Sequence, residues 1–198
     1  MQFYINVLNK NEQVRLLSKI ALIIHKAPLY RPTIPRWNKP FNLLITNAGK
    51  WGWTSDIKGY KYINSHPLTG DFWPEIPLLL KQIWRTYTGL KIEPNSCLIN
   101  LYENLNSKLG LHQDKDENDF SFPVLSISFG NTGIFYYGKT KDKKYLKKIE
   151  LPSGSVVIMQ EKSRLMYHSI AKILQVKDNL AYKTCSKFFP RESRVNIT

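Results

Sequence analysis

Between Ser96 and His168, apolar and polar residues alternate in several short runs, and this pattern constrains the fold more than any other feature. Successive side chains of a strand point to opposite faces, so alternation buries one face of a sheet. Glycine, proline, asparagine and aspartate clusters separate the runs, as in tight turns. The pattern predicts strands at Ser96–Glu103, Phe122–Phe129, Thr132–Tyr137, Tyr145–Leu151, Ser155–Gln160 and Arg164–His168.

Two helices are predicted ahead of these strands. Apolar residues recur at helical spacing from Asn11 to Lys26, with Asn9 or Asn11 as a possible cap, and again from Pro74 to Thr88. Two helices followed by many short strands predict an α+β, mainly β fold, with an antiparallel double sheet and the helices packed on one side. Neither repeats nor linkers divide the chain, so we expect a single domain over residues 1–198.

The segment between these helices is rich in aromatic and basic residues. Residues 27–40 contain four prolines beside arginine, lysine and tryptophan, so we expect a surface loop, either a lid on a bound partner or a plain connection. A short strand at 41–46 follows. Four further aromatic residues interleave with lysines and offer stacking surfaces for bases, or alternatively a hairpin packed on the core: Trp51, Trp53, Tyr60 and Tyr62.

A formal net charge of +14 favours nucleic acid as the partner, because a positive field of this size attracts polyanions. The alternative is a lysine-rich solvated surface. The two cysteines, Cys97 and Cys185, lie far apart, and Cys97 is expected to be a buried thiol in a reducing compartment. Neither a membrane-spanning run nor a signal peptide is recognisable, so we expect a cytoplasmic monomer that does not contact membranes.

His112 and Asp114 are the strongest candidates for metal ligands. In an extended segment, residues two apart project to the same side, so the imidazole and the carboxylate would share one space. The alternative is a surface turn with a local hydrogen bond. Among the remaining histidines, His168 lies in a predicted strand and is the natural third ligand. His25 is expected to be a capping or surface residue near a helix end, and His66 has no partner at ligand spacing. Two histidines and one carboxylate suit non-haem Fe(II) that activates oxygen.

Several runs of the chain resemble the AlkB family of alkylated nucleic-acid repair dioxygenases, in consistent order from about residue 42 to residue 198. They are T-N-A-G-K-W-G-W-T, K-G-Y-K-Y, C-L-I-N-L-Y, L-H-Q-D-K-D-E, P-V-L-S-I-S-F-G-N-T-G-I-F, G-S-V-V-I-M, S-R-L-M-Y-H-S-I and R-V-N-I-T.

This resemblance implies a double-stranded β-helix, or jelly roll, with its core in residues 96–198 and a nucleotide-recognition lid in residues 27–66. It implies oxidative demethylation of N-alkylated bases of the 1-methyladenine and 3-methylcytosine type, dependent on Fe(II), 2-oxoglutarate and O2, as direct DNA repair. The iron ligands, which are also the catalytic residues, would be His112, Asp114 and His168.

The resemblance also assigns binding roles to other residues. The residues expected to bind 2-oxoglutarate are Asn100, Tyr102, Arg194 and Asn196. On the substrate side, Trp53 would stack on an extruded base, Tyr60 would lie near the base and its phosphate, Asp116 would accept from an exocyclic amino group and Lys115 would contact a phosphate. Substrate would be a flipped or single-stranded base in DNA or RNA.

The family motif continues from R-V-N-I-T to a second arginine, two residues past Thr198, which would engage the other carboxylate of 2-oxoglutarate. Lys183, Lys187 or Arg191 are the candidates within the sequence to replace it. This difference supports an alternative expectation, an AlkB-like protein that binds nucleic acid without efficient turnover. A hydroxylase of protein side chains is a third possibility, disfavoured by the positive charge and the substrate-side residues.

Overall fold

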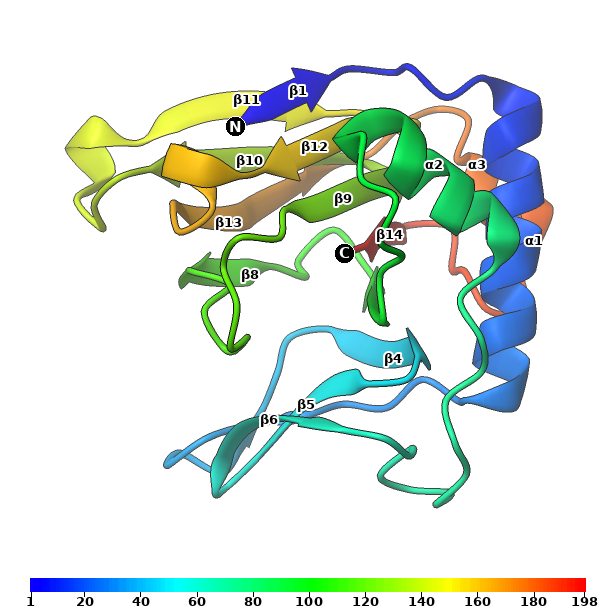
Figure 1. Cartoon of the computed structure of the whole chain (residues 1–198). Helices are drawn as coiled ribbons and strands as arrows, with labels where there is room; N and C mark the ends of the chain where they lie inside the picture. Colours follow the sequence, from blue (N-terminus) through cyan, green and yellow to red (C-terminus); the bar gives the residue numbers. More distant parts are fainter.

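The computed structural model describes all residues 1–198 and contains two larger β-sheets, two small hairpins and a few helices (Figure 1). The helices are α1 (Lys10–Lys26), α2 (Leu78–Thr88) and α3 (Leu180–Thr184), with 3-10 turns η1 (Lys143–Tyr145) and η2 (Glu161–Ser163). The strands are β1 (Gln2–Tyr4), β2 (Thr33–Ile34), β3 (Lys39–Pro40), β4 (Leu44–Gly49), β5 (Gly52–Asp56), β6 (Gly59–Ile63), β7 (Ser96–Tyr102), β8 (Leu109–His112), β9 (Val124–Gly130), β10 (Thr132–Gly138), β11 (Lys147–Leu151), β12 (Val156–Met159), β13 (Tyr167–Leu174) and β14 (Arg194–Ile197).

The larger sheet has six strands in the order β1-β12-β9-β14-β7-β4, and the smaller has four in the order β11-β10-β13-β8. Neighbouring strands pair antiparallel in both. The sheets pack against each other through an apolar cluster that includes Tyr102 and Val157 of the larger sheet and Phe135 and Ile170 of the smaller one. This mostly antiparallel, jelly-roll-like architecture with few helices confirms the predicted mainly β class.

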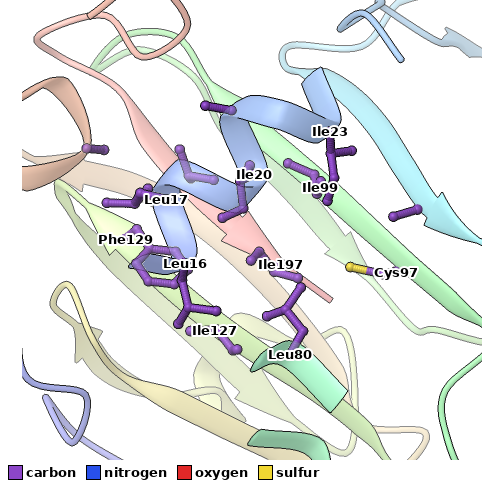
Figure 2. Packing of buried hydrophobic residues seen from close by; sticks show 14 of the residues in the cluster. Leu16, Leu17, Ile20, Ile23, Leu80, Cys97, Ile99, Ile127, Phe129 and Ile197 are labelled. Carbon is purple, nitrogen blue, oxygen red and sulfur yellow. The ribbon is translucent and has the colours of Figure 1, made fainter. Parts of the chain in front are cut away.

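The second apolar cluster joins the helices to the larger sheet (Figure 2). Leu16, Leu17 and Ile20 on one face of α1 are fully buried, and they pack with Ile127 and Phe129 of β9. Apolar residues at this spacing form a stripe along one side of a helix, so burial of the stripe holds α1 on the sheet. Figure 1 shows α1 at the end of the molecule away from the β10–β11 turn.

The ends of the helices follow local rules. The Asn9 side chain accepts a hydrogen bond from the Glu12 N–H at 3.0 Å, and the Glu12 carboxylate accepts one from the Asn9 N–H at 2.7 Å. This capping box shows that Asn9, one of the two predicted candidates, is the cap. Helix α2 begins at Leu78 and not at the predicted Pro74, because Pro77 holds the residue before it in an extended conformation.

Several predicted boundaries were wrong. The predicted loop at 27–40 contains the β2–β3 hairpin. Pro40, which has no N–H to donate, pairs with Thr33 in this two-stranded sheet, where both strands are edge strands. The strand expected at 41–46 runs from Leu44 to Gly49. The strand expected to end at His168 instead begins at Tyr167 and continues to Leu174, because residues 161–163 form a 3-10 turn. Strands β8 and β14, which were not predicted, carry site residues.

Two residues outside the predicted site, His66 and Cys97, have structural roles. His66 is buried with both ring nitrogens in use: Nε2 bonds to the Pro28 carbonyl at 2.7 Å, and Nδ1 accepts from Leu68 and Thr69 N–H at 3.2 Å. Cys97 is buried in the helix–sheet core, and burial raises the pKa of its thiol to about 12. None of the helices is long and apolar enough to cross a membrane.

Candidate active site

His112, Asp114 and His168 come together at the paired ends of β8 and β13. His112 lies directly opposite His168 in the antiparallel register. Nε2 of His112 is 3.5 Å from Asp114 Oδ1, and Nε2 of His168 is 3.6 Å from Asp114 Oδ2. One ligand atom from each of the three residues lies within 4.8 Å of the others, a spacing at which one ion can bind all three. His25 and His66 are not part of this group.

Both imidazoles are oriented by backbone contacts. Nδ1 of His112 is 2.8 Å from the Gly110 carbonyl, and Nδ1 of His168 is 3.1 Å from the Met166 carbonyl. A carbonyl can only accept, so each Nδ1 carries a proton, and each Nε2 faces Asp114. This is the arrangement by which proteins fix the tautomer of metal-binding histidines.

The electrostatics of the three side chains also suit a cation. Burial raises the pKa of Asp114, but contact with His112 and the positive charges around it outweigh burial and lower that pKa to about 2. Burial lowers the pKa of His168 and keeps its imidazole neutral. Burial acts the same way on His112, where the neighbouring Asp114 carboxylate raises the pKa overall. A carboxylate anion beside imidazole lone pairs is a donor set for Fe(II).

Sequence reasoning missed the residue that anchors the ligand loop. Arg164 is buried, and its Nη1 donates to the Asp114 carbonyl at 2.7 Å. In addition, Gln113 Nε2 donates to the Leu165 carbonyl at 2.5 Å. The loop that carries Asp114 is therefore fixed to the segment before β13, which carries His168. The position of Arg164, four residues before His168, does not predict a contact with Asp114, which lies 50 positions earlier.

The four residues expected to bind 2-oxoglutarate are adjacent on β7 and β14. Asn100 lies opposite Asn196 in the register, and Tyr102 lies opposite Arg194. Asn100 Nδ2 donates to Asn196 Oδ1 at 3.5 Å, and Asn196 Nδ2 donates to Ser126 Oγ at 2.7 Å. The side chains of all four residues line the cavity that also contains the metal-binding group.

Arg194 fits a carboxylate ligand. Its guanidinium is fully buried, donates to two backbone carbonyls and to Ser128 Oγ at 2.7 Å, and has no acidic partner. Its Nε is buried with no hydrogen-bond partner. Burial lowers its pKa only to about 10, so the group is charged at neutral pH. A buried cation with an unsatisfied donor is costly unless an anion completes it, as a carboxylate of 2-oxoglutarate would.

The substrate-side residues form a second cluster at the same cavity. The rings of Trp53 and Tyr60 are stacked, with centroids 5.6 Å apart and planes at 21°. Trp53 Nε1 donates to Asp116 Oδ2 at 2.8 Å, which ties the β5–β6 hairpin to the ligand loop. Lys115 is exposed beside them. Trp53 also contacts Phe41, whose ring lies edge-on with centroids 6.1 Å apart, and Trp53, Tyr60 and Phe41 all line the cavity.

One cavity of about 1210 Å³ contains all eleven predicted site residues. None of Lys183, Lys187 and Arg191, considered as replacements for a second arginine, lines it. Lys183 pairs with Asp178 at 2.6 Å, and the Lys187 amine lies over the Phe188 ring. All three residues therefore lie outside the cavity that Arg194 lines.

Comparison with known proteins agrees with this geometry. The family model described as 2OG-Fe(II) oxygenase superfamily matches residues 1–198. The "Alpha-ketoglutarate-dependent dioxygenase AlkB homolog" of Caulobacter vibrioides is 38% identical over 162 residues, covering 82% of this chain and 70% of that protein. The "Alpha-ketoglutarate-dependent dioxygenase AlkB" of Escherichia coli is 35% identical over 164 residues, covering 81% and 75%.

A solved structure described as "The structure of OsALKBH1" superposes with a TM-score of 0.81 at 28% identity, covering 98% of this chain and 93% of that one. Fold and site thus define an Fe(II)- and 2-oxoglutarate-dependent oxygenase, with Fe(II), 2-oxoglutarate and O2 as its cofactor and co-substrates. Within that class, the chain belongs to the AlkB family.

Proposed function

We propose that this enzyme removes methyl groups from ring nitrogens of nucleic-acid bases, of the 1-methyladenine and 3-methylcytosine type, on a double-stranded β-helix scaffold. The observation that carries the proposal is that the stacked Trp53–Tyr60 pair and the metal-binding group line one cavity. A base stacked on the indole would lie beside the three residues that would hold the iron. The relatives named AlkB, and the "Nucleic acid dioxygenase ALKBH1" of Mus musculus, 36% identical over 141 residues, support this class of substrate.

The chain's own residues have distinct tasks in this reaction. His112, Asp114 and His168 would hold Fe(II), while Arg194 and the Asn100–Asn196 pair would hold 2-oxoglutarate. When bound, iron and 2-oxoglutarate use O2 to hydroxylate the N-methyl group, which is lost as formaldehyde, with release of succinate and carbon dioxide. Asp116 Oδ2 already accepts from Trp53, so Oδ1 is the oxygen that accepts from an exocyclic amino group.

The charge of the chain suits an extruded base. Taking a base out of a duplex costs a few kcal/mol, and contacts between lysines and the phosphate backbone help to offset that cost. The 29 lysines and arginines, which give the chain a net charge of +14, are the residues that would make such contacts. A single-stranded substrate, DNA or RNA, avoids most of the cost.

The test is an anaerobic incubation with Fe(II) and 2-oxoglutarate, followed by O2 and an oligonucleotide with one 1-methyladenine. We expect equal amounts of succinate and formaldehyde from wild type and neither from His112→Ala. Trp53→Ala should form no formaldehyde but should still form succinate slowly without substrate, because the residues that would bind iron and 2-oxoglutarate are intact. Binding of the oligonucleotide with no more succinate than His112→Ala gives would instead favour the alternative, a nucleic-acid-binding protein without efficient turnover.

A further inference from the structure

Glu117 joins two parts of the site that are far apart in the sequence. Its Oε1 accepts a hydrogen bond from the Tyr62 hydroxyl at 2.9 Å, and its Oε2 accepts one from Arg164 Nη2 at 3.1 Å. Tyr62 belongs to the β5–β6 hairpin, which also carries Trp53, whereas Arg164 directly follows η2. One carboxylate therefore connects the nucleotide-side hairpin to the segment that leads into His168.

Arg164 passes this connection on to the metal-binding group. Its remaining nitrogens donate to the Phe122 carbonyl at 2.9 Å and to the Asp114 carbonyl at 2.7 Å. A guanidinium is planar and rigid, so its three contacts keep fixed relative positions. A displacement of Glu117 would therefore move the Asp114 carbonyl oxygen through Arg164. This oxygen is two bonds from the Asp114 Cα, which bears the ligand side chain.

We propose that Glu117 is a positioning residue that couples the β5–β6 hairpin to the iron ligand Asp114, through Tyr62 on one side and Arg164 on the other. The nucleotide part of this inference rests on the proposed function, because only a substrate held by the hairpin would use the coupling. Linkage then requires that metal and nucleic acid strengthen each other's binding by the same factor.

Two observations support a specific contact at Glu117. The Trp53–Asp116 hydrogen bond at 2.8 Å joins the same hairpin to the same loop, so the contact is not isolated. Burial and the charge of Glu117 both raise the pKa of Tyr62, so its hydroxyl keeps its proton and remains a donor.

The test measures binding of Co(II), followed by its visible absorption, to Tyr62→Phe, Glu117→Gln and the double variant without nucleic acid. Tyr62→Phe removes the donor alone, and Glu117→Gln removes the negative charge that pairs with Arg164 and one of the two acceptor oxygens. We expect each single variant to bind Co(II) about ten-fold more weakly, the effect usual for partners of metal ligands. The double variant should be no weaker than Glu117→Gln, because both changes break one path.

Two matched controls separate coupling from general destabilisation. Asp119→Asn removes a carboxylate of the same loop that contacts only Ser121, and Tyr87→Phe removes a hydroxyl from α2, away from the cavity. Both should bind Co(II) like wild type. Unchanged Co(II) affinity in Tyr62→Phe, or additive losses in the double variant, would overturn the proposal, and a lower Tm with unchanged affinity would indicate a structural role only.

A second arm adds a methylated oligonucleotide to the Co(II) titration. Wild type should bind Co(II) more tightly with the oligonucleotide than without it, and Tyr62→Phe should lose that difference. An oligonucleotide that does not bind at all would count against the proposed substrate, whereas the titration without nucleic acid still decides whether Tyr62 acts on the metal site. Equal enhancement in wild type and Tyr62→Phe would count against the coupling.

Discussion

His168 lies directly opposite His112 across the antiparallel pair β13–β8, with ring centroids 4.3 Å apart. A register pair of histidines on the same face of two strands projects both rings into one space. Asp114, two residues after His112, completes the group from the loop. The sheet therefore positions two of the three candidate ligands, and the loop that Arg164 anchors carries the third.

Removal of one register partner should abolish metal binding. We expect His168→Ala to lower Fe(II) and Co(II) affinity by more than about 100-fold, because even the outer partners of a metal ligand are worth 10–100-fold. Isothermal titration of the metal-free protein measures this directly. His25→Ala, an exposed histidine at the end of α1, is the matched control and should bind like wild type. Equal affinity in His168→Ala and the control would remove His168 from the site.

Gly133 should control binding of 2-oxoglutarate. A Cβ at this position of β10 would lie 2.8 Å from Arg194 Cζ and Nε, closer than packed atoms approach. Gly133→Ala must therefore displace a fully buried guanidinium. Since a hydrogen bond to a charged group contributes about 1.5–3 kcal/mol, the KM for 2-oxoglutarate should rise roughly 10- to 100-fold.

The control for this prediction is a glycine that leaves room for a side chain. A Cβ at Gly110, in β8, meets no atom within 4 Å, and its φ is not in the left-handed region. Gly110→Ala should keep the wild-type KM for 2-oxoglutarate. Co(II) affinity should be unchanged in Gly133→Ala, so a loss of metal binding there would show damage wider than the displacement of Arg194.

The sequence predicts the two longer helices, α1 and α2, and the strands β4, β7 and β9 to β13, with shifted ends, because their apolar spacing is local. It fails at β14, where all four residues are buried although two are polar, because Arg194 and Asn196 face a cavity and not water. It fails at β8 because Gly110 interrupts a run of only four residues. The His112–Asp114 spacing is also local and predicts a ligand pair. The contacts of Arg164 with Asp114 and Glu117 join residues about fifty positions apart, and no local pattern carries them.

The two free cysteines should react very differently. Cys97 is 5% exposed, and burial raises its thiol pKa to about 12, whereas Cys185 is half-buried at the end of α3. We expect iodoacetamide to label only Cys185 in the native protein at pH 8, and both cysteines in urea. Because the folded pKa of Cys97 is raised, its ionisation favours unfolding, and stability should fall as pH rises from about 9 toward 12. Mass spectrometry of the labelled peptides checks the first part, and labelling of native Cys97 would contradict the core packing.

The β10–β11 turn should bind the nucleic-acid backbone outside the cavity. Residues 139–148 contain six lysines and one aspartate, a net charge of +5, and every lysine among them is exposed. Lys141 lines the cavity and lies 5.5 Å from the centre of the Tyr167 ring, so the basic segment begins at the site and continues outward along the turn. Substitution of Lys143, Lys144 and Lys148 by glutamine should weaken binding of single-stranded oligonucleotides and reduce the salt dependence of that binding. For every lysine that no longer neutralises a phosphate, the slope of log K against log salt should become shallower by about 0.7.

Oligonucleotide length and a charge-matched control make this prediction specific. Substitution of Lys10, Lys19 and Lys26 by glutamine removes the same charge from α1, at the other end of the molecule in Figure 1. If phosphates cross the turn, its variant should lose affinity for a long oligonucleotide while its KM for a methylated trinucleotide, too short to reach it, is unchanged. The α1 variant should keep nearly the wild-type affinity for the long oligonucleotide and nearly the wild-type KM for the trinucleotide. Equal losses in the two variants would mean that net charge alone attracts nucleic acid, and that the strand takes no defined course over the β10–β11 turn.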